Sequence, residues 1–154
     1  MIKLFITPEH VKATTSISSA TDNDLISQKI YYAQITDIKR VLGLKLYDKI
    51  TLNYLNLTGI YKTIFDSYII DMHVFYTAYY FVLFNEVKIS NAGNTILSLE
   101  RGQPAENTME LANQYKNLGI NIEDNFREFM ETADVLEWNC EQKGNETTNF
   151  NDFY

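Results

Sequence analysis

The stretch DMHVFYTAYYFVLFNEVKISNAGNTI, residues 71–96, decides which fold this sequence can adopt. Its most apolar part, from His73 to Phe84, is 12 residues long, whereas a helix needs about 20 residues to cross a bilayer. Acidic residues, Asp71 and Glu86, lie just outside its two ends. We therefore predict that it does not span a membrane and belongs to a helix in the core of a globular domain.

The helix that contains this stretch is predicted to run from about residue 61 to residue 85. Its apolar side chains lie on two faces at helical spacing: Phe65, Tyr68, Met72, Phe75, Tyr76, Tyr79 and Leu83 on one face, and Ile64, Val74, Ala78 and Val82 on another. A helix that is apolar on nearly every side packs against several neighbours at once. The sequence therefore predicts that this helix is the centre of the domain.

A polar turn follows the central helix, in VKISNAGNTILSL, residues 87–99. Apolar residues flank Asn91-Ala92-Gly93-Asn94, and both Gly and Asn tolerate the positive φ that tight turns need. This pattern predicts a short β-hairpin with four-residue strands. Because an isolated hairpin is barely stable in water, we expect it to pack on the central helix or to pair with another chain.

The N-terminal region is predicted to hold a short edge strand and two helices. Residues 2–6 alternate between apolar and polar types, which favours a strand. The Ser/Thr-rich segment after it is predicted to be a loop with one helical turn after its proline. A helix should then begin at Thr21 or Asp22, either of which can cap it, and end at Gly43. A shorter helix is predicted in KLYDKITLNYLN, residues 45–56.

Gln34 is an unusual residue for its position in the first of these helices, because it lies on the apolar stripe between Ile30 and Ile38. A buried amide needs hydrogen-bond partners. We therefore expect Gln34 either to bond the backbone of a nearby loop or to lie at the edge of the stripe in contact with water.

The last predicted helix covers about residues 105–138, with Pro104 just before it. Apolar residues recur along it at steps of three and four: Leu111, Tyr115, Leu118, Ile122, Phe126, Phe129, Ala133 and Leu136. This period passes through Gly119 unbroken, which favours one helix at a cost of about 1 kcal/mol for the glycine. Two helices bent at Gly119 are the alternative.

These elements together predict a mainly α fold: a helical bundle with a long central aromatic helix, one short β-hairpin and a long C-terminal helix. A chain of 154 residues suits a single core. We expect one helical domain over residues 1–140 and a flexible C-terminal tail over residues 141–154.

Charge is distributed unevenly along the chain, whose net charge is −7. Residues 1–62 hold 8 basic and 5 acidic side chains, a net of +3, whereas residues 100–154 hold 4 and 12, a net of −8. Copies of such a polar molecule can pair head to tail, although a solvated acidic helix explains the same pattern. A sequence-specific nucleic-acid binder is disfavoured, because phosphate contacts need clustered Lys and Arg.

The sequence contains no pattern typical of catalysis, of a bound metal or of a cofactor. His10, His73 and Cys140 are far apart, so His73 is expected to be a packed or hydrogen-bonded histidine. No phosphate-binding glycine loop and no metal motif is present. The C-terminal helix carries many carboxylates without any histidine, which favours a solvated helix face over a metal site: Glu123, Asp124, Glu128, Glu131, Asp134 and Glu137. The single cysteine indicates a reducing compartment.

The segment IYYAQITDIKRVLGLKLYDKI, residues 30–50, resembles head–tail connector (adaptor) proteins of tailed bacteriophages, especially those of Bacteroidetes-infecting and crAss-like phages. The matching features are Ala33-Gln34, Ile38, Leu42-Gly43 and Leu46-Tyr47. FITPEHVKATTSI before the capped helix, the central aromatic helix and KISNAGNT after it are also similar. The likeness covers about residues 4–100 and rests on the order of elements, because no single motif is diagnostic.

This resemblance implies a structural virion protein without catalysis. It implies a helical bundle that forms a homo-oligomeric ring, commonly of twelve copies, at the head–tail junction. The ring would bind the portal protein and other neck or tail proteins, after assembly in the host cytoplasm. DNA would pass through without sequence-specific binding, along an acidic inner wall. The family's contact surfaces are not defined by short motifs, so individual contact residues do not follow from the likeness.

We expect two elements to contact other subunits or neighbouring rings: the turn residues Asn91, Ala92, Gly93 and Asn94, and the tail residues Phe150, Phe153 and Tyr154. Aromatic side chains at the end of a polar tail can fill a partner's groove, or fold back on their own domain. Two other functions stay open. One is a small helical regulatory or protein-binding module with an acidic docking helix, and the other is an enzyme whose carboxylates act only in an oligomer.

Overall fold

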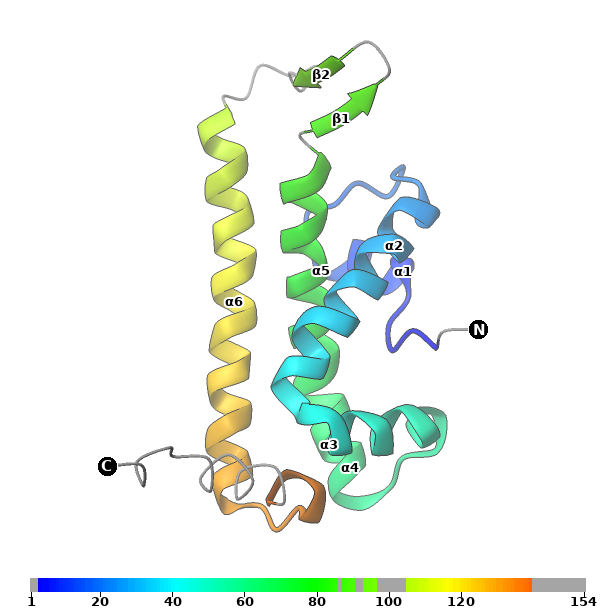
Figure 1. Ribbon diagram of the computed structural model, residues 1–154, viewed down its shortest axis with the longest axis vertical. Helices are drawn as coiled ribbons and strands as arrows, with labels where there is room; N and C mark the ends of the chain where they lie inside the picture. Colours follow the sequence, from blue (N-terminus) through cyan, green and yellow to red (C-terminus); the bar gives the residue numbers. More distant parts are fainter. Residues whose placement is uncertain (1–2, 86, 91–92, 97–104, 140–154) are drawn as a thin grey trace, which may run out of the picture.

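A computed structural model describes residues 3–85, 87–90, 93–96 and 105–139 of the chain (Figure 1). This part is mainly helical, which confirms the coarser prediction of a mainly α fold. Within the same ranges, no helix is both long and apolar enough to cross a membrane. The long helices α5 (Ile70–Asn85) and α6 (Ala105–Thr132) stand side by side along one long axis, so the described part of the molecule is elongated (Figure 1).

The central helix consists of three consecutive segments without a break. These are α4 (Gly59–Ile64), a π-helical turn η3 (Phe65–Ile69) and α5 (Ile70–Asn85). The predicted range of about 61–85 therefore agrees with the structure. α5 packs against the C-terminal helix α6 (Ala105–Thr132) on one side and against α2 (Asn23–Ala33) on the other (Figure 1). This double packing explains why α5 is apolar nearly all round.

The N-terminal helices follow the predicted start and stop signals. α1 (Pro8–Thr14) begins after Thr7, whose side chain accepts a hydrogen bond from the His10 backbone. In α2, Asp22 is the N-cap and accepts from the Asp24 backbone N–H. A second π-helical turn, η1 (Gln34–Ile38), continues α2 into α3 (Lys39–Asn53).

Gly43 breaks α3 as predicted. Its φ is 73° and its ψ is 164°, a conformation that disfavours any residue with a Cβ atom. The chain therefore changes direction there, which brings the rest of α3 across the end of the molecule (Figure 1). A 3₁₀ turn, η2 (Tyr54–Asn56), then leads towards α4.

The predicted edge strand at residues 2–6 is wrong in the part that the structure describes, because residues 3–7 form no strand. This segment is instead held by the side chain of Gln34. The Phe5 backbone N–H donates to Gln34 Oε1 at 3.0 Å, and Gln34 Nε2 donates to the Lys3 carbonyl oxygen at 2.9 Å. The prediction that Gln34 bonds a loop backbone is thus confirmed, and the water-exposed alternative is wrong, because Gln34 is buried.

Replacing Gln34 with leucine should lower the free energy of unfolding by about 1–3 kcal/mol, because it leaves backbone groups of Phe5 and Lys3 without their partner. Urea unfolding measures this loss. Gln28→Leu is a matched control, since Gln28 is exposed on the same helix and its replacement should change stability by less than about 0.5 kcal/mol. Equal effects of the two variants would contradict this role of Gln34.

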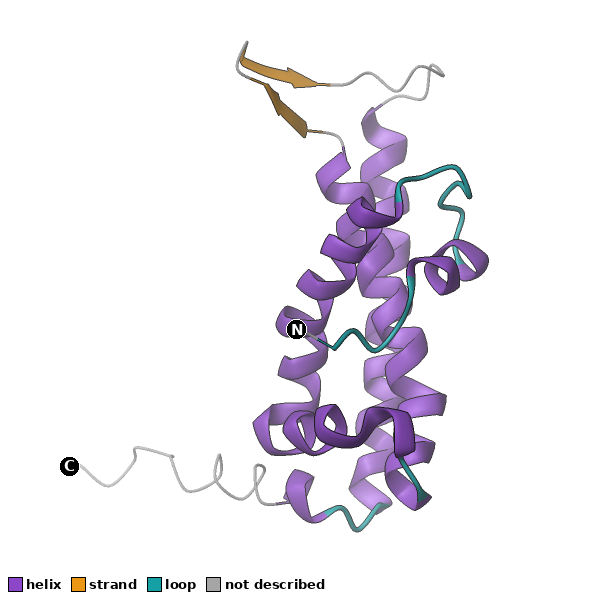
Figure 2. Cartoon of the chain, turned by 90° about the vertical axis from the view of Figure 1, so that its right-hand side faces the viewer, coloured by secondary structure: helices purple, strands orange, loops and turns teal. Residues whose placement is uncertain are grey.

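Two short strands follow α5: β1 (Val87–Ser90) and β2 (Gly93–Ile96). They pair antiparallel, with Val87 opposite Ile96 and Ser90 opposite Gly93. Both strands lie beyond the ends of α5 and α6, at the far end of the molecule from α3 and α4 (Figure 2). The turn residues Asn91 and Ala92 lie outside the described residues.

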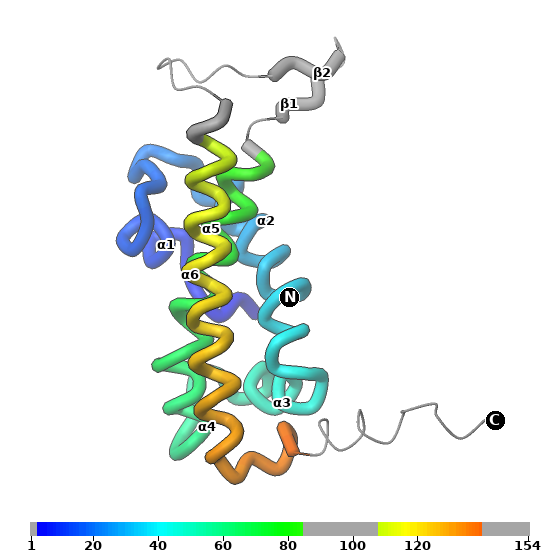
Figure 3. The backbone as a smooth tube through the Cα atoms, turned by 90° about the vertical axis from the view of Figure 1, so that its left-hand side faces the viewer, coloured from blue at the N-terminus to red at the C-terminus, as the bar shows by residue number. Residues whose placement is uncertain are grey.

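α6 is one continuous helix along α5 (Figure 3), so the alternative of two helices bent at Gly119 is wrong. It ends at Thr132 and not near residue 138 as predicted. The chain bends after Thr132 and forms one more helical turn at residues 136–139. This bend lets Trp138 pack edge-on against Phe126, with ring centroids 5.4 Å apart. The helix therefore ends at Thr132, although its apolar periodicity continues, because the bend allows Trp138 and Val135 to be buried in the core.

Gly119 has a packing role that the sequence did not reveal. A Cβ atom at this position would lie 3.0 Å from Cε1 and 3.1 Å from Cζ of Tyr76 on α5. The Tyr76 ring has little freedom to move, because it is buried and its hydroxyl donates to Glu123. The glycine therefore lets α5 and α6 approach closely without displacing the Tyr76 ring.

We expect Gly119→Ala to lower the free energy of unfolding overall. The contact with Tyr76 costs about 1–3 kcal/mol, and this cost outweighs the gain of up to about 1 kcal/mol that alanine brings to a helix. Thermal unfolding monitored by circular dichroism tests it. Asn117→Ala is the control, because Asn117 is exposed on the same helix and should become slightly more stable. A Gly119→Ala protein that melts above the wild type would show that Tyr76 moves aside.

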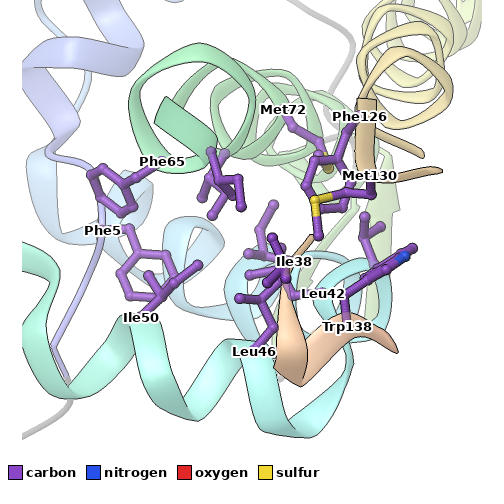
Figure 4. Close-up of a cluster of buried hydrophobic side chains, with 14 of the residues drawn as sticks. Phe5, Ile38, Leu42, Leu46, Ile50, Phe65, Met72, Phe126, Met130 and Trp138 are labelled. Carbon is purple, nitrogen blue, oxygen red and sulfur yellow. The ribbon is translucent and has the colours of Figure 1, made fainter. Parts of the chain in front are cut away.

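Within the described ranges, the buried side chains form two groups along α5. The larger group lies at the α3–α4 end and joins Phe5, α3, α4, α5 and α6 (Figure 4). The smaller group joins α1, α2, the middle of α5 and Tyr115 of α6. Of the predicted face of the central helix, Met72 is fully buried, whereas Phe75 and Tyr79 are only partly buried.

Candidate functional site

Among the residues that the structure describes, the largest group of hydrogen-bonded charged side chains surrounds the carboxylate of Glu123, at the junction of α3, α5 and α6. The residue is only 9% exposed. Arg40 of α3 donates to both of its oxygens, with Nη1–Oε1 at 3.0 Å and Nη2–Oε2 at 2.8 Å. This two-pronged geometry is the strongest form of an arginine–carboxylate pair.

Two further donors complete the environment of Glu123. Arg127, one turn further along α6, donates from Nη2 to Oε1 at 2.9 Å, and the Tyr76 hydroxyl of α5 donates to Oε2 at 2.9 Å. The carboxylate is therefore bonded by groups from three helices. It fixes the position of α3 and α5 relative to α6.

Burial acts to raise the pKa of Glu123, but hydrogen bonds from Arg40, Arg127 and Tyr76 outweigh it and lower the pKa to about 2. Burial and the hydrogen bond to this carboxylate raise the pKa of the Tyr76 hydroxyl. At neutral pH, Glu123 is thus ionised and Tyr76 is neutral. A carboxylate whose pKa is this low is a poor general acid or base. Its hydrogen bonds to groups from three helices indicate a structural role instead.

Asp37 extends this cluster into the π-helical turn η1. It accepts a hydrogen bond from the Tyr80 hydroxyl at 2.7 Å and lies 3.5 Å from Arg40. Burial raises the pKa of Tyr80, and the bond to Asp37 adds to this effect. The Tyr80 ring in turn contacts the rings of Tyr32 and Phe84, which are partly exposed. Buried ionic groups and an exposed aromatic surface are thus joined through one tyrosine.

A second, smaller group of polar contacts holds the final helical turn, residues 136–139, in place. Glu137 accepts a hydrogen bond from the Tyr61 hydroxyl at 2.7 Å and lies 3.8 Å from Lys49. The final helical turn is therefore attached to α3 and α4 as well as to the core through Trp138.

The acidic side chains of the C-terminal helix do not form the uniform solvated face that the sequence indicated. Asp124, Glu128 and Glu131 are exposed as expected, whereas Glu123 is buried and Glu137 is bonded. A signal for Glu123 is present in the sequence, because it lies four residues after Gly119 and three before Phe126, on the apolar face. Within the described ranges, no group of three or more His, Cys, Asp or Glu residues is arranged to hold a metal ion.

His73 is a packed histidine, as predicted. It is fully buried, and its Nε2 lies 2.9 Å from the Ile30 carbonyl oxygen of α2. Because a carbonyl can only accept, Nε2 carries the proton and Nδ1 is the unprotonated nitrogen. Burial lowers the pKa of His73 to about 4, so the ring is neutral at physiological pH.

The structure leaves the predicted contact residues largely undescribed. Gly93 and Asn94 belong to β2. The other predicted contacts, Asn91, Ala92, Phe150, Phe153 and Tyr154, lie outside the described residues, and so does Cys140. Their role in binding other subunits stays a prediction.

Comparison with known proteins identifies one family. A family model described as "Family of unknown function (DUF6712)" matches residues 38–148. These residues include α3, the central helix and α6, and therefore both Arg40 and Glu123 of the carboxylate cluster. No curated protein and no solved structure matches the chain significantly. Because the match covers well over half of its 154 residues, the chain belongs to the DUF6712 family.

Proposed function

We propose that this protein is a structural component of a phage neck, where copies form a ring between portal and tail through which DNA passes. The resemblance over residues 4–100 supports the proposal, and the mainly helical fold agrees with it. The buried carboxylates of Glu123 and Asp37 form hydrogen bonds to side chains of neighbouring helices, so they stabilise the domain itself. Catalysis and cofactors have no part in this proposal.

The observation that carries the proposal is a group of exposed apolar side chains at the α3–α4 end. Leu52 and Leu55 are 73% and 77% exposed, and Leu136 in the final helical turn is 71% exposed. Ile60, the second residue of α4, is also exposed. Burying one such side chain contributes about 1.5–3 kcal/mol. Several of them at one end of a molecule are typical of a surface that a neighbouring protein covers.

The hairpin at the opposite end is the second contact element of this proposal. The strands form a two-stranded sheet, and the outer edges of such a sheet can pair with another chain. Thr95 to Leu99 carry no charged side chain that would oppose such pairing. The two ends of an elongated molecule would then contact different neighbours in the neck.

Imaging of purified protein tests this proposal most directly. We expect closed rings of a single copy number in electron micrographs, and the chain in purified phage particles by mass spectrometry. A protein that is monomeric at all concentrations and absent from particles would contradict it.

The C-terminal tail provides a narrower prediction. Deleting residues 145–154 should leave the melting temperature of the monomer unchanged but weaken assembly onto the particle, because the tail's aromatic side chains are expected to anchor on a partner. Differential scanning calorimetry and particle incorporation measure the two effects. A melting temperature several degrees lower would show that the tail folds back on its own domain, and normal assembly would show that it is not an anchor.

A helical regulatory module that binds another protein is the alternative. The exposed carboxylates Asp124, Glu128 and Glu131 favour it, since they offer an acidic surface to a basic partner. Such a module would stay monomeric alone and form a complex of fixed stoichiometry with that partner. Ring formation by the isolated chain therefore separates the two functions.

A further inference from the structure

The outer face of α6 carries exposed acidic side chains, most of them in its C-terminal half. Exposed carboxylates recur there at helical spacing, in Glu110, Asp124, Glu128 and Glu131. Between them lie exposed amides, Asn113, Gln114, Asn117, Asn121 and Asn125. The basic residues of the helix point elsewhere, because Lys116 lies over the Tyr79 ring and Arg127 bonds Glu123. We call the four carboxylates and these amides the acidic face.

The opposite charge is gathered on the helical segment α2–η1–α3. Residues 25–45 contain three lysines, Lys29, Lys39 and Lys45, besides Arg40, whose charge is paired with Glu123. Their single acid, Asp37, is buried and bonded to Tyr80. Lys29 and Lys39 each lie over an aromatic ring, at 5.0 Å from Phe84 and 5.8 Å from Tyr47. We call the exposed side of residues 25–45 the basic face.

Both faces also expose large apolar side chains. The basic face has Leu25, Tyr31, Tyr32, Ile35 and Leu44, and the acidic face is flanked by Met109, Leu118 and Ile120. Apolar area with charges around it is typical of protein–protein interfaces. Each face therefore offers both the area and the charges that a docking surface needs.

The two faces lie on different sides of the molecule, because α6 packs on one side of α5 and α2 on the other (Figure 1). Figure 3 shows the same arrangement, with α6 nearest the viewer. A face of one charge repels its own copy, so a symmetric pair of acidic faces is unfavourable. Contact between the acidic face of one copy and the basic face of a second copy is favourable. The resulting pair still has one unoccupied acidic face and one unoccupied basic face. Repeating this contact produces a ring or a filament.

We propose that the acidic face of α6 docks on the basic face of α2–η1–α3 in a second copy of the chain. This inference deepens the proposed function, because it names the surfaces through which neighbouring subunits would meet. It needs no movement of Arg40 or Glu123, whose bond stays within one copy. The exposed lysines of one copy would face the exposed carboxylates of the next.

Charge reversal in the full-length protein tests the interface. One variant carries Glu128→Lys and Glu131→Lys, and the other carries Lys29→Glu and Lys39→Glu. Each should weaken self-association at least about tenfold in sedimentation experiments at low salt, because it brings like charges together. An equal mixture of the two should assemble again, since each reversed face then meets a complementary one.

A matched control carries Asp66→Lys and Asp71→Lys, which change the net charge as much as the first variant at exposed positions outside both faces. It should associate like the wild type, and all variants should keep the wild-type melting temperature to within a few degrees. Weakening by the control equal to that of the face variants, or a mixture that fails to assemble, would overturn the inference.

The outcomes also separate this inference from the proposed function. If the wild type assembles and enters phage particles while both face variants assemble equally well, the interface is wrong and the neck function stands. If the wild type assembles through these faces but is absent from purified particles, the interface stands and the neck function is wrong.

Discussion

Replacing Phe126 with alanine should lower the free energy of unfolding by about 3–5 kcal/mol, the largest single effect we expect in this chain. Phe126 is fully buried in α6. Its ring contacts Tyr68 of η3 at 5.8 Å and Trp138 at 5.4 Å between centroids. The variant would leave a cavity where the central helix, α6 and the final helical turn meet (Figure 4).

The measurement is urea unfolding followed by circular dichroism and by Trp138 fluorescence. Phe129→Ala is the matched control, because Phe129 lies on the same helix and contacts Tyr68 but is only partly buried. It should lose less than half as much stability, since it has less apolar area to lose. Similar losses for both variants would contradict the central position of Phe126 in the core.

The second large effect is a loss of stability in mild acid that depends on His73. Its pKa is about 4 in the folded protein because the ring is fully buried, against about 6.5 in the unfolded chain. Below pH 6.5 the unfolded state therefore binds the proton more readily. The neutral ring's contribution is fully present above pH 6.5 and is lost as the pH falls to about 4. The shift corresponds to about 3 kcal/mol.

His73→Gln removes the titration while keeping a donor for the Ile30 carbonyl oxygen. Unfolding free energies of wild type and variant, measured from pH 7.5 to pH 4, should converge by about 3 kcal/mol as the pH falls. Parallel curves would contradict the prediction. Glu123 acts in a lower window, because its pKa is about 2: its contribution is present above about pH 4.5 and is lost towards pH 2.

Local signals in the sequence predicted most of the fold correctly. The central helix could be predicted from its sequence, because a helix buried on all sides carries apolar residues on every face in each turn. Gly43 was correctly predicted to end a helix, because this follows from the chemistry of glycine itself. The loop bond of Gln34 was one of the two alternatives that the sequence left open for a polar residue on an apolar stripe. The mainly helical class followed from these elements.

The carboxylate cluster was missed because its members are far apart in sequence. Arg40 and Glu123 are separated by 83 positions, and no local pattern brings them together. The edge strand at residues 2–6 was wrong because the partner of that segment is a side chain, Gln34, and not a neighbouring strand. The last helix was predicted too long because its periodicity continues through residues that bend back onto the core.

The sequence by itself determined which segments are helical, where α2 begins, and that Gly43 breaks the helical path of the chain. It also determined that the basic residues lie mainly in the first part of the chain and the acidic residues in the last. These properties depend on neighbouring residues and on composition. Only the tertiary structure decided which acids are buried, why Gly119 faces Tyr76, and that the acidic and basic faces lie on different sides of α5. The reason is physical: burial and ion pairing depend on distances between segments, and packing of the helices, not their individual sequences, sets those distances.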